Sequence, residues 1–168
     1  AAKCQAGQIW IKRVVAEMGG KDCIIVDETA DLDKAATGIV KSAFGYQGQK
    51  CSACSRAIIV DSVYDEVLEK VCKMTSELTV GEAKANCDVN AVIDDRAYEK
   101  ILDYIEIGHK EGRIVEGGGS SSGVGYYIEP TVIEGLSPYA RAAQEEIFGP
   151  VLAFIRADSY DNAVEIAN

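Results

Sequence analysis

The sequence has little positive charge and no long apolar run. Lys and Arg total 17 against 27 Asp and Glu, which gives a formal net charge of -10 at pH 7. Nucleic-acid binding needs a basic face that attracts phosphates, so this balance argues against a nucleic-acid partner and gives no support for an anionic membrane surface. No stretch approaches the roughly 20 apolar residues that cross a bilayer. We expect a soluble, acidic globular protein without membrane contact.

The sequence also has little histidine, and its first residues do not resemble a secretory leader. His109 is the single histidine, and residues 1–5 have neither the charged start nor the apolar stretch of a signal peptide. The six cysteines are Cys4, Cys23, Cys51, Cys54, Cys72 and Cys87. Because their spacing is irregular and no leader precedes them, we expect reduced thiols in a cytoplasmic protein rather than disulfides.

The apolar pattern predicts strands that alternate with helices. Strands are expected within 7–18, after a turn, and over 23–26, 57–60, 114–115, 127–128 and 151–155. Helices are expected over 32–43, 63–78, 97–110 and from 158 onward. Thr29 or Asp31 can cap the first of these helices. The alternation implies βαβ units, and therefore an α/β fold with a mostly parallel sheet.

A glycine- and serine-rich segment at 117–125 resembles a phosphate loop in composition only. It has neither the Gly-Lys-Ser/Thr ending nor the helix that such a loop needs. We interpret it as a surface turn.

Cys51 and Cys54 form a C-x-x-C pair that follows a glycine-rich turn. Amide dipoles and cations such as Lys50 and Arg56 favour the thiolate that a nucleophile requires. The residues alone also allow an inert buried cysteine, a redox dithiol or half of a zinc site. Zinc normally needs four ligands, no second C-x-x-C follows, and His109 is expected on the solvent face of a helix, so no metal site is predicted.

Two carboxylates stand beside glycines. Glu17 precedes Met18-Gly19-Gly20, where burial that raises its pKa would make it a general base. A surface glutamate at a turn is the alternative. Glu146 lies just before a predicted strand, where a carboxylate could accept hydrogen bonds from ribose hydroxyls. The alternative there is an ordinary polar segment.

Three segments together resemble the aldehyde dehydrogenase superfamily in order and approximate separation: Glu17-Met18-Gly19-Gly20-Lys21, Gly48-Gln49-Lys50-Cys51 and Glu145-Glu146-Ile147-Phe148-Gly149-Pro150. The longer stretches 48–56 and 104–108 are similar to the bacterial 1-pyrroline-5-carboxylate dehydrogenase branch, which oxidises glutamate semialdehyde to glutamate in proline breakdown. The resemblance covers nearly the whole chain. It implies a three-layer αβα catalytic domain over 17–168, incomplete at its C-terminal end, with 1–16 as the tail of an upstream cofactor-binding domain.

The resemblance also implies roles for individual residues. Cys51 matches the nucleophile that attacks the aldehyde, and Glu17 matches the base that activates water to hydrolyse the thioester. Ser52, next to the nucleophile, is a candidate substrate contact. The C-x-x-C pair occurs in this branch, so it implies neither a redox nor a metal site.

The cofactor implied by the resemblance is NAD, with NADP as the alternative. Glu146 matches the carboxylate that binds the ribose beside the nicotinamide, Phe148 matches the ring near it, and Gly19 borders the cofactor. In the family, a hydride passes from the hemithioacetal to this cofactor.

The resemblance further implies that the oxyanion asparagine, a cofactor-binding lysine and most of the dinucleotide-binding domain lie upstream of Ala1. The predicted last helix has no stop signal before Asn168. We therefore expect an internal fragment, inactive alone, of a homo-oligomeric enzyme. A relative that passes its acyl group to coenzyme A or phosphate is one alternative, against which Glu17 argues. A non-catalytic homologue is the other, against which the intact motifs argue.

Overall fold

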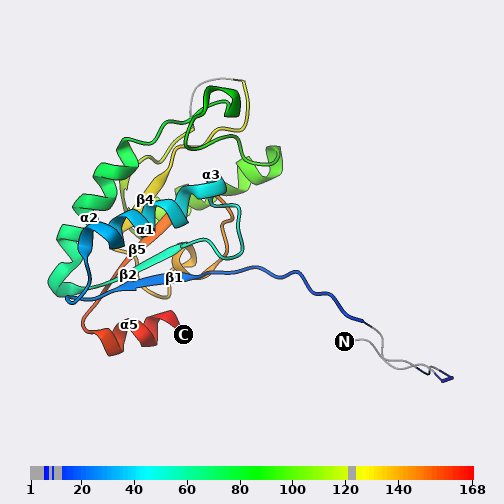
Figure 1. Ribbon diagram of the computed structural model, residues 1–168. Coiled ribbons are helices and arrows are strands. Elements are labelled where there is room, and N and C mark those ends of the chain that lie inside the picture. Colours follow the sequence, from blue (N-terminus) through cyan, green and yellow to red (C-terminus); the bar gives the residue numbers. More distant parts are fainter. Residues whose placement is uncertain (1–5, 8, 10–12, 121–123) are drawn as a thin grey trace.

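The computed structural model describes residues 6–7, 9, 13–120 and 124–168. Five strands form one sheet, shown in Figure 1, in the order β1 (Cys23–Val26), β2 (Arg56–Val60), β5 (Val151–Ala157), β4 (Thr131–Glu134) and β3 (Arg113–Glu116). The first four are parallel neighbours, and β3 runs antiparallel to β4. The predicted α/β fold with a mostly parallel sheet is confirmed.

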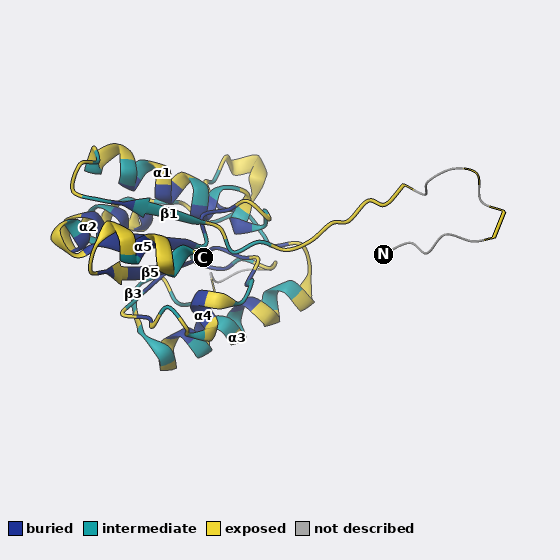
Figure 2. Ribbon diagram, turned by 90° about the horizontal axis from the view of Figure 1, so that it is seen from below, coloured by how far each residue is buried: buried dark blue, intermediate teal, exposed yellow. Residues whose placement is uncertain are grey.

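Helices cover both faces of the sheet, as Figure 2 shows. On one side lie α1 (Leu32–Phe44) and α2 (Asp61–Ser76), and on the other lie α3 (Asp95–Glu111), α4 (Arg141–Gln144) and α5 (Tyr160–Ala167). Successive side chains of β2 point to opposite faces of the sheet: Ile59 packs with α1 and α2, whereas Ile58 packs with α4 and α5. The expected three layers are therefore confirmed. Two short 3-10 helices, η1 (Gly45–Gly48) and η2 (Ala83–Ala85), lie in connections.

The start of α1 is set by Asp31, one of the two predicted caps. Its carboxylate accepts a hydrogen bond from the backbone N–H of Lys34 at 3.2 Å. Thr29 is not the cap, because its hydroxyl donates to Asp27 at 2.8 Å instead. The predicted helices over 63–78 and 97–110 are likewise present, and His109 is exposed on α3 as expected.

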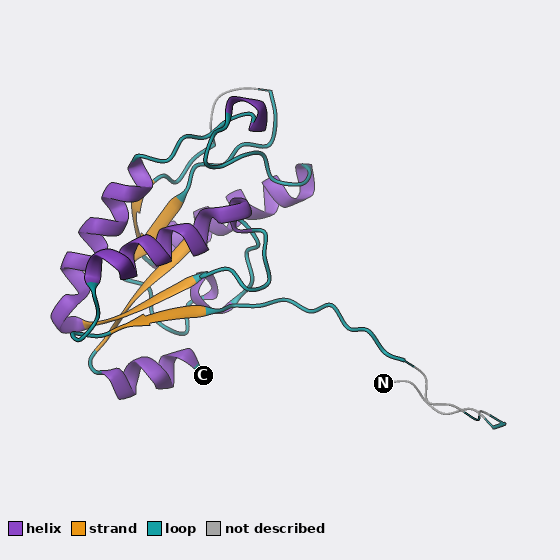
Figure 3. Cartoon of the chain, viewed as in Figure 1, coloured by secondary structure: helices purple, strands orange, loops and turns teal. Residues whose placement is uncertain are grey.

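Two predicted strands are wrong. Residues 13–20 have no regular structure (Figure 3), because this segment pairs with no strand of the described sheet. Val14 and Val15 are exposed. Ile9, another predicted position, is also exposed, whereas Trp10 and Ile11 lie outside the described residues. The strand expected at 127–128 begins instead at Thr131, after Pro130, which has no N–H to donate to a ladder. Ile128 forms only an isolated bridge with Ser120.

The described part of the predicted surface turn at 117–125 contains no helix or strand, as the surface-turn interpretation requires. None of the helices in the described ranges is both long enough and apolar enough to cross a membrane.

Candidate active site

Three segments that are distant in sequence meet at one edge of the sheet. Residues 17–22 precede β1, residues 49–55 precede β2, and residues 145–150 precede β5. Because these three strands are parallel neighbours, the segments before them lie together at the amino-terminal edge. Ligands of open α/β sheets more often bind at the opposite, carboxyl edge. The candidate site lies at the amino-terminal edge because each of the three motifs comes just before its strand in the sequence.

The three segments border an open cavity of about 660 Å³. Its lining includes every residue that the sequence proposed for the site: Glu17, Gly19, Cys51, Ser52, Glu146 and Phe148. Met18, Gln49, Lys50 and Lys100 complete the lining. The structure thus brings the predicted nucleophile, base and cofactor carboxylate to one place.

Cys51 is exposed on a turn that directly follows η1. The chain leaves α1 through three consecutive left-handed residues, Tyr46, Gln47 and Gly48, with φ of 55°, 57° and 65°. The side chain of Gln49 accepts a hydrogen bond from the Ile93 N–H at 3.0 Å and ties the turn to a distant loop. The nucleophile candidate is therefore accessible and is presented by a defined backbone.

Cys54 lies in a different environment from Cys51. Its side chain is only 2% exposed, its thiol donates to the Arg56 carbonyl at 3.3 Å, and its N–H donates to Ser42 Oγ at 3.1 Å. Burial raises the pKa of Cys54 to about 12. A thiol that resists ionisation is a poor partner for thiol–disulfide exchange, so the arrangement does not support a redox dithiol.

The five cysteines in the described ranges, Cys23, Cys51, Cys54, Cys72 and Cys87, are free thiols. Among the residues that the structure describes, no group of three or more His, Cys, Asp or Glu side chains gathers to hold a metal.

Glu146 is held against the glycine turn of the first segment. The N–H of Gly20 donates to Glu146 Oε1 at 2.9 Å. A Cβ on Gly19 would collide with this carboxylate, and a Cβ on Gly20 would collide with the carbonyl oxygen of Cys51. At Gly20 a side chain would push the first segment away from the Cys51 backbone, whereas at Gly19 it would displace the Glu146 carboxylate.

The other predicted residues line the cavity with fewer contacts. Glu17 is exposed in the irregular segment 13–20, and Ser52 is exposed beside Cys51. The Phe148 side chain is 40% exposed and its backbone is left-handed, with φ of 62°. A left-handed phenylalanine is uncommon and marks a turn that the surrounding structure must hold in place.

Lys100 of α3 was not predicted from the sequence. It lines the cavity, and its ammonium donates to the carbonyl of Glu146 at 2.9 Å. The two residues are 46 positions apart, and a lysine on the polar face of an amphipathic helix carries no local signal of function. Only the packing of α3 beside the third segment reveals it.

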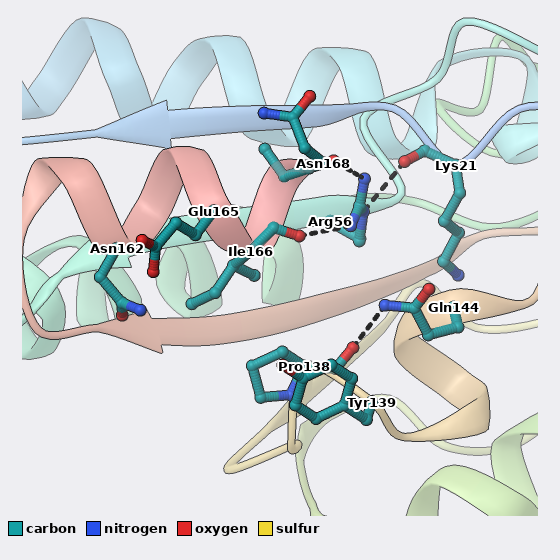
Figure 4. A pocket seen from close by; sticks show the side chains of 10 residues that line it. Lys21, Arg56, Pro138, Tyr139, Gln144, Asn162, Glu165, Ile166 and Asn168 are labelled. Atoms are coloured by element: carbon teal, nitrogen blue, oxygen red, sulfur yellow. Dashed lines mark hydrogen bonds between the residues drawn. The ribbon is translucent and has the colours of Figure 1, made fainter.

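Arg56 does not act as the cationic neighbour of Cys51 that the sequence suggested. Its guanidinium donates to the carbonyls of Lys21, Ile166 and Ala167 at 2.9, 3.1 and 3.1 Å, as Figure 4 shows. It lines a separate pocket of about 300 Å³ that does not include Cys51. Its role is to fix the backbone before β1 and to cap the end of α5.

The model of the family described as "Aldehyde dehydrogenase family" matches residues 2–168. The chain belongs to the aldehyde dehydrogenase family. The predicted superfamily is thus confirmed.

Among its relatives, this aldehyde dehydrogenase chain is 58% identical over 169 aligned positions to the 1-pyrroline-5-carboxylate dehydrogenase of Geobacillus thermodenitrificans. The alignment covers 100% of the chain and 33% of that relative. A solved structure of 1-pyrroline-5-carboxylate dehydrogenase from Thermus with bound NAD has a TM-score of 0.93 at 54% identity, covering 96% of this chain and 31% of that one.

A third similar protein is the gamma-glutamyl-gamma-aminobutyraldehyde dehydrogenase of Burkholderia cenocepacia, with a TM-score of 0.87 and 39% identity over 90% of this chain and 31% of that one. The aldehyde dehydrogenase chain therefore spans about a third of the length of the relatives that it matches. The predicted resemblance to the bacterial 1-pyrroline-5-carboxylate dehydrogenase branch is confirmed.

Proposed function

We propose that this chain is the nucleophile-bearing part of an NAD-dependent dehydrogenase that oxidises glutamate semialdehyde to glutamate. The main support for this proposal is that Cys51, Glu17 and Glu146 line one cavity. Relatives at 58% and 54% identity, both named 1-pyrroline-5-carboxylate dehydrogenase, support the substrate, and the role in proline breakdown follows from the resemblance to that branch. The coverage of one third of their length supports a longer polypeptide, with 17–168 as catalytic domain and 1–16 as the end of a cofactor-binding domain.

The residues at the Glu146 turn suit a nicotinamide nucleotide. One carboxylate oxygen accepts the Gly20 N–H, and a carboxylate has further acceptor capacity for ribose hydroxyls. The partly exposed Phe148 ring gives the same cavity an apolar wall. The Thermus relative with bound NAD supports NAD as the cofactor, with NADP as the alternative. Glu146 and Phe148 would hold NAD here, and the bound NAD would supply a hydride acceptor for oxidation of the substrate carbon attached to Cys51.

The chain's own residues supply the covalent and hydrolytic steps. The Cys51 thiolate adds to the aldehyde carbon, and its exposure on the turn gives substrate direct access. The Glu17 carboxylate, on the same cavity, takes a proton from the water that cleaves the thioester and releases the acid. A base in that position supports hydrolysis rather than transfer to coenzyme A or phosphate. Ser52 contacts the bound substrate beside the nucleophile.

The proposal extends to the setting of the enzyme. Five free thiols in the described part of the chain support a reducing compartment, and we assign the enzyme to the cytoplasm. We further assign the full-length enzyme to a homo-oligomer, following the family resemblance.

Replacing Cys51 tests the proposed function in the full-length protein. Cys51→Ala should lower NAD-dependent oxidation of glutamate semialdehyde by at least about a thousandfold, because no other thiol of the described residues lines the cavity. NAD binding measured by calorimetry should stay unchanged. Cys54→Ala is the matched control: it removes a buried thiol three positions away and should keep most activity. Near-normal turnover by Cys51→Ala would contradict the proposal.

A further inference from the structure

Glu145, the residue immediately before Glu146, is held by side chains from two helices. The hydroxyl of Tyr104 on α3 donates to Glu145 Oε2. Arg141 on α4 donates through Nε to Oε1 at 3.0 Å and through a terminal nitrogen to Oε2 at 2.9 Å. Such a two-point arginine–carboxylate contact fixes orientation as well as distance. Both oxygens of Glu145 are therefore occupied.

The same face of α3 also contacts Glu146. Lys100, one helical turn before Tyr104, donates to the Glu146 carbonyl at 2.9 Å. The Lys100 ammonium and the Arg141 guanidinium each lie 5.8 Å from the centre of the Tyr104 ring. Two successive residues of the third segment are thus anchored to α3, Glu145 through its side chain and Glu146 through its main chain.

The segment needs these anchors because it has no secondary structure of its own. It leaves α4 after Gln144 and enters β5 at Val151, and Glu145 is extended, with φ of -88° and ψ of 142°. Successive side chains of extended backbone point to opposite sides. Holding Glu145 toward α3 and α4 therefore turns Glu146 the other way, toward the N–H of Gly20.

We propose that Tyr104, Glu145 and Arg141 form a positioning network that aims the Glu146 carboxylate at the nicotinamide nucleotide. This inference rests on the proposed function, since it assigns the network's purpose to the same site. Tyr104, Glu145 and Arg141 are all absent from the lining of the 660 Å³ cavity, whereas Glu146 and Lys100 belong to it. The three residues act through Glu146 and do not touch substrate.

The network keeps its charges across the neutral range. The Arg141 guanidinium, and after it the Tyr104 hydroxyl, lower the pKa of Glu145 to about 2. The Glu145 carboxylate in turn raises the pKa of Tyr104, so the hydroxyl stays protonated and remains a donor. The contacts that aim Glu146 are therefore present at every pH at which the enzyme would work.

Tyr104→Phe in the full-length protein tests the network by removing one hydroxyl. Losing a hydrogen bond to a charged group should raise the KM and the calorimetric Kd for NAD about three- to tenfold. The kcat, the KM for the aldehyde and the alkylation rate of Cys51 without NAD should stay near wild type. Glu145→Ala removes the acceptor of that hydroxyl together with both Arg141 contacts, so its effect should be at least as large. The double variant should then be little worse than Glu145→Ala alone, because the hydroxyl has already lost its partner.

Tyr98→Phe is the matched control, because Tyr98 lies on the same helix with its ring 6.0 Å from that of Tyr126, and among the described residues its hydroxyl forms no hydrogen bond. The network would be overturned if Tyr104→Phe left the KM and Kd for NAD unchanged, or if Tyr98→Phe changed them equally. It would also be overturned if the effects of the two single variants multiplied in the double variant. A wild-type protein that binds NAD without oxidising the aldehyde would instead overturn the proposed function, while its Kd still tests Tyr104.

Discussion

At the scale of single residues, Lys21 is the clearest case of a side chain whose chemistry its neighbours have altered. Its ammonium donates to the Ala142 carbonyl at 2.9 Å, with the buried Arg56 guanidinium nearby. Burial, and after it the charge of Arg56, lowers the pKa of Lys21 from 10.5 to about 8. The sequence alone does not predict this shift, because it arises from burial in the folded chain and from Arg56, which is 35 positions away.

The sign of the shift fixes its effect on stability. The unfolded chain holds the Lys21 proton up to about pH 10.5 and the folded chain only up to about pH 8, so unfolding takes up a proton between these values. Stability contributed by this group therefore rises with pH across that window, by about 3 kcal/mol in total, and is lowest below pH 8.

Acylation of amines, measured by mass spectrometry of individual peptides, checks this prediction. The rate for Lys21, which lines the 300 Å³ pocket, should rise through a midpoint near pH 8 in the folded protein and near pH 10.5 in urea. Arg56→Met should move the folded midpoint upward, since it removes a neighbouring cation. A folded midpoint equal to that in urea would refute the shift.

At the scale of secondary structure, the cap of α1 offers a comparison between two neighbouring candidates. Asp31 accepts the Lys34 N–H, whereas the N–H and the hydroxyl of Thr29 both donate to Asp27. Asp31→Ala should therefore lower the Tm by about 3 °C, and Thr29→Ala by less, because only the first leaves a helix donor without its partner. Circular dichroism melting curves of the two variants measure this, and equal losses would reassign the cap.

The elements that the sequence predicted well are those whose pattern is local. The helix from Leu32 buries Ala36, Ile39, Val40 and Ala43 at the spacing that predicted it. The errors concern strands, which need partners that sequence does not supply. The apolar run before Met18 resembles a strand in composition, yet its described part pairs with nothing in the described sheet. The strand that begins at Thr131 is only four residues long, and it is recognised by its pairing with β5, where Thr131 lies opposite Val151.

At the scale of the whole molecule, local chemistry made Cys51, Glu17 and Glu146 candidates, and the resemblance was needed to assign the roles of all six proposed site residues. No property of Cys51 alone separated it from the other cysteines. The sheet order explains why the three motifs meet, since β1, β2 and β5 are neighbours although 90 residues separate β2 from β5. Lys100, Tyr104 and Glu145 could not be predicted, because their roles depend on the packing of α3 beside the third segment.

Gly48 tests whether the site depends on the close approach of its segments. It is left-handed, with φ of 65°, and a Cβ there would collide with the carbonyl oxygen of Gly149. Gly48→Ala should therefore push the Cys51 turn away from the Glu146 segment and strain its own backbone. In the full-length protein we expect the KM for NAD to rise at least about tenfold. Because Cys51 and Glu146 line one cavity, bound NAD should change the alkylation rate of Cys51 in the wild type, and Gly48→Ala should lose most of that change.

Gly38→Ala supplies the comparison, because Gly38 lies within α1 and an added Cβ would meet nothing within 4 Å. Alanine favours a helix interior, so this variant should keep the KM for NAD and be at least as stable as wild type. Both variants add one methyl group, to α1 or just after it, but only at Gly48 is the backbone left-handed and does the methyl face Gly149. If NAD affects Cys51 alkylation equally in the two, the turn and the Glu146 segment are not coupled through Gly48, and the nucleotide site must tolerate their separation.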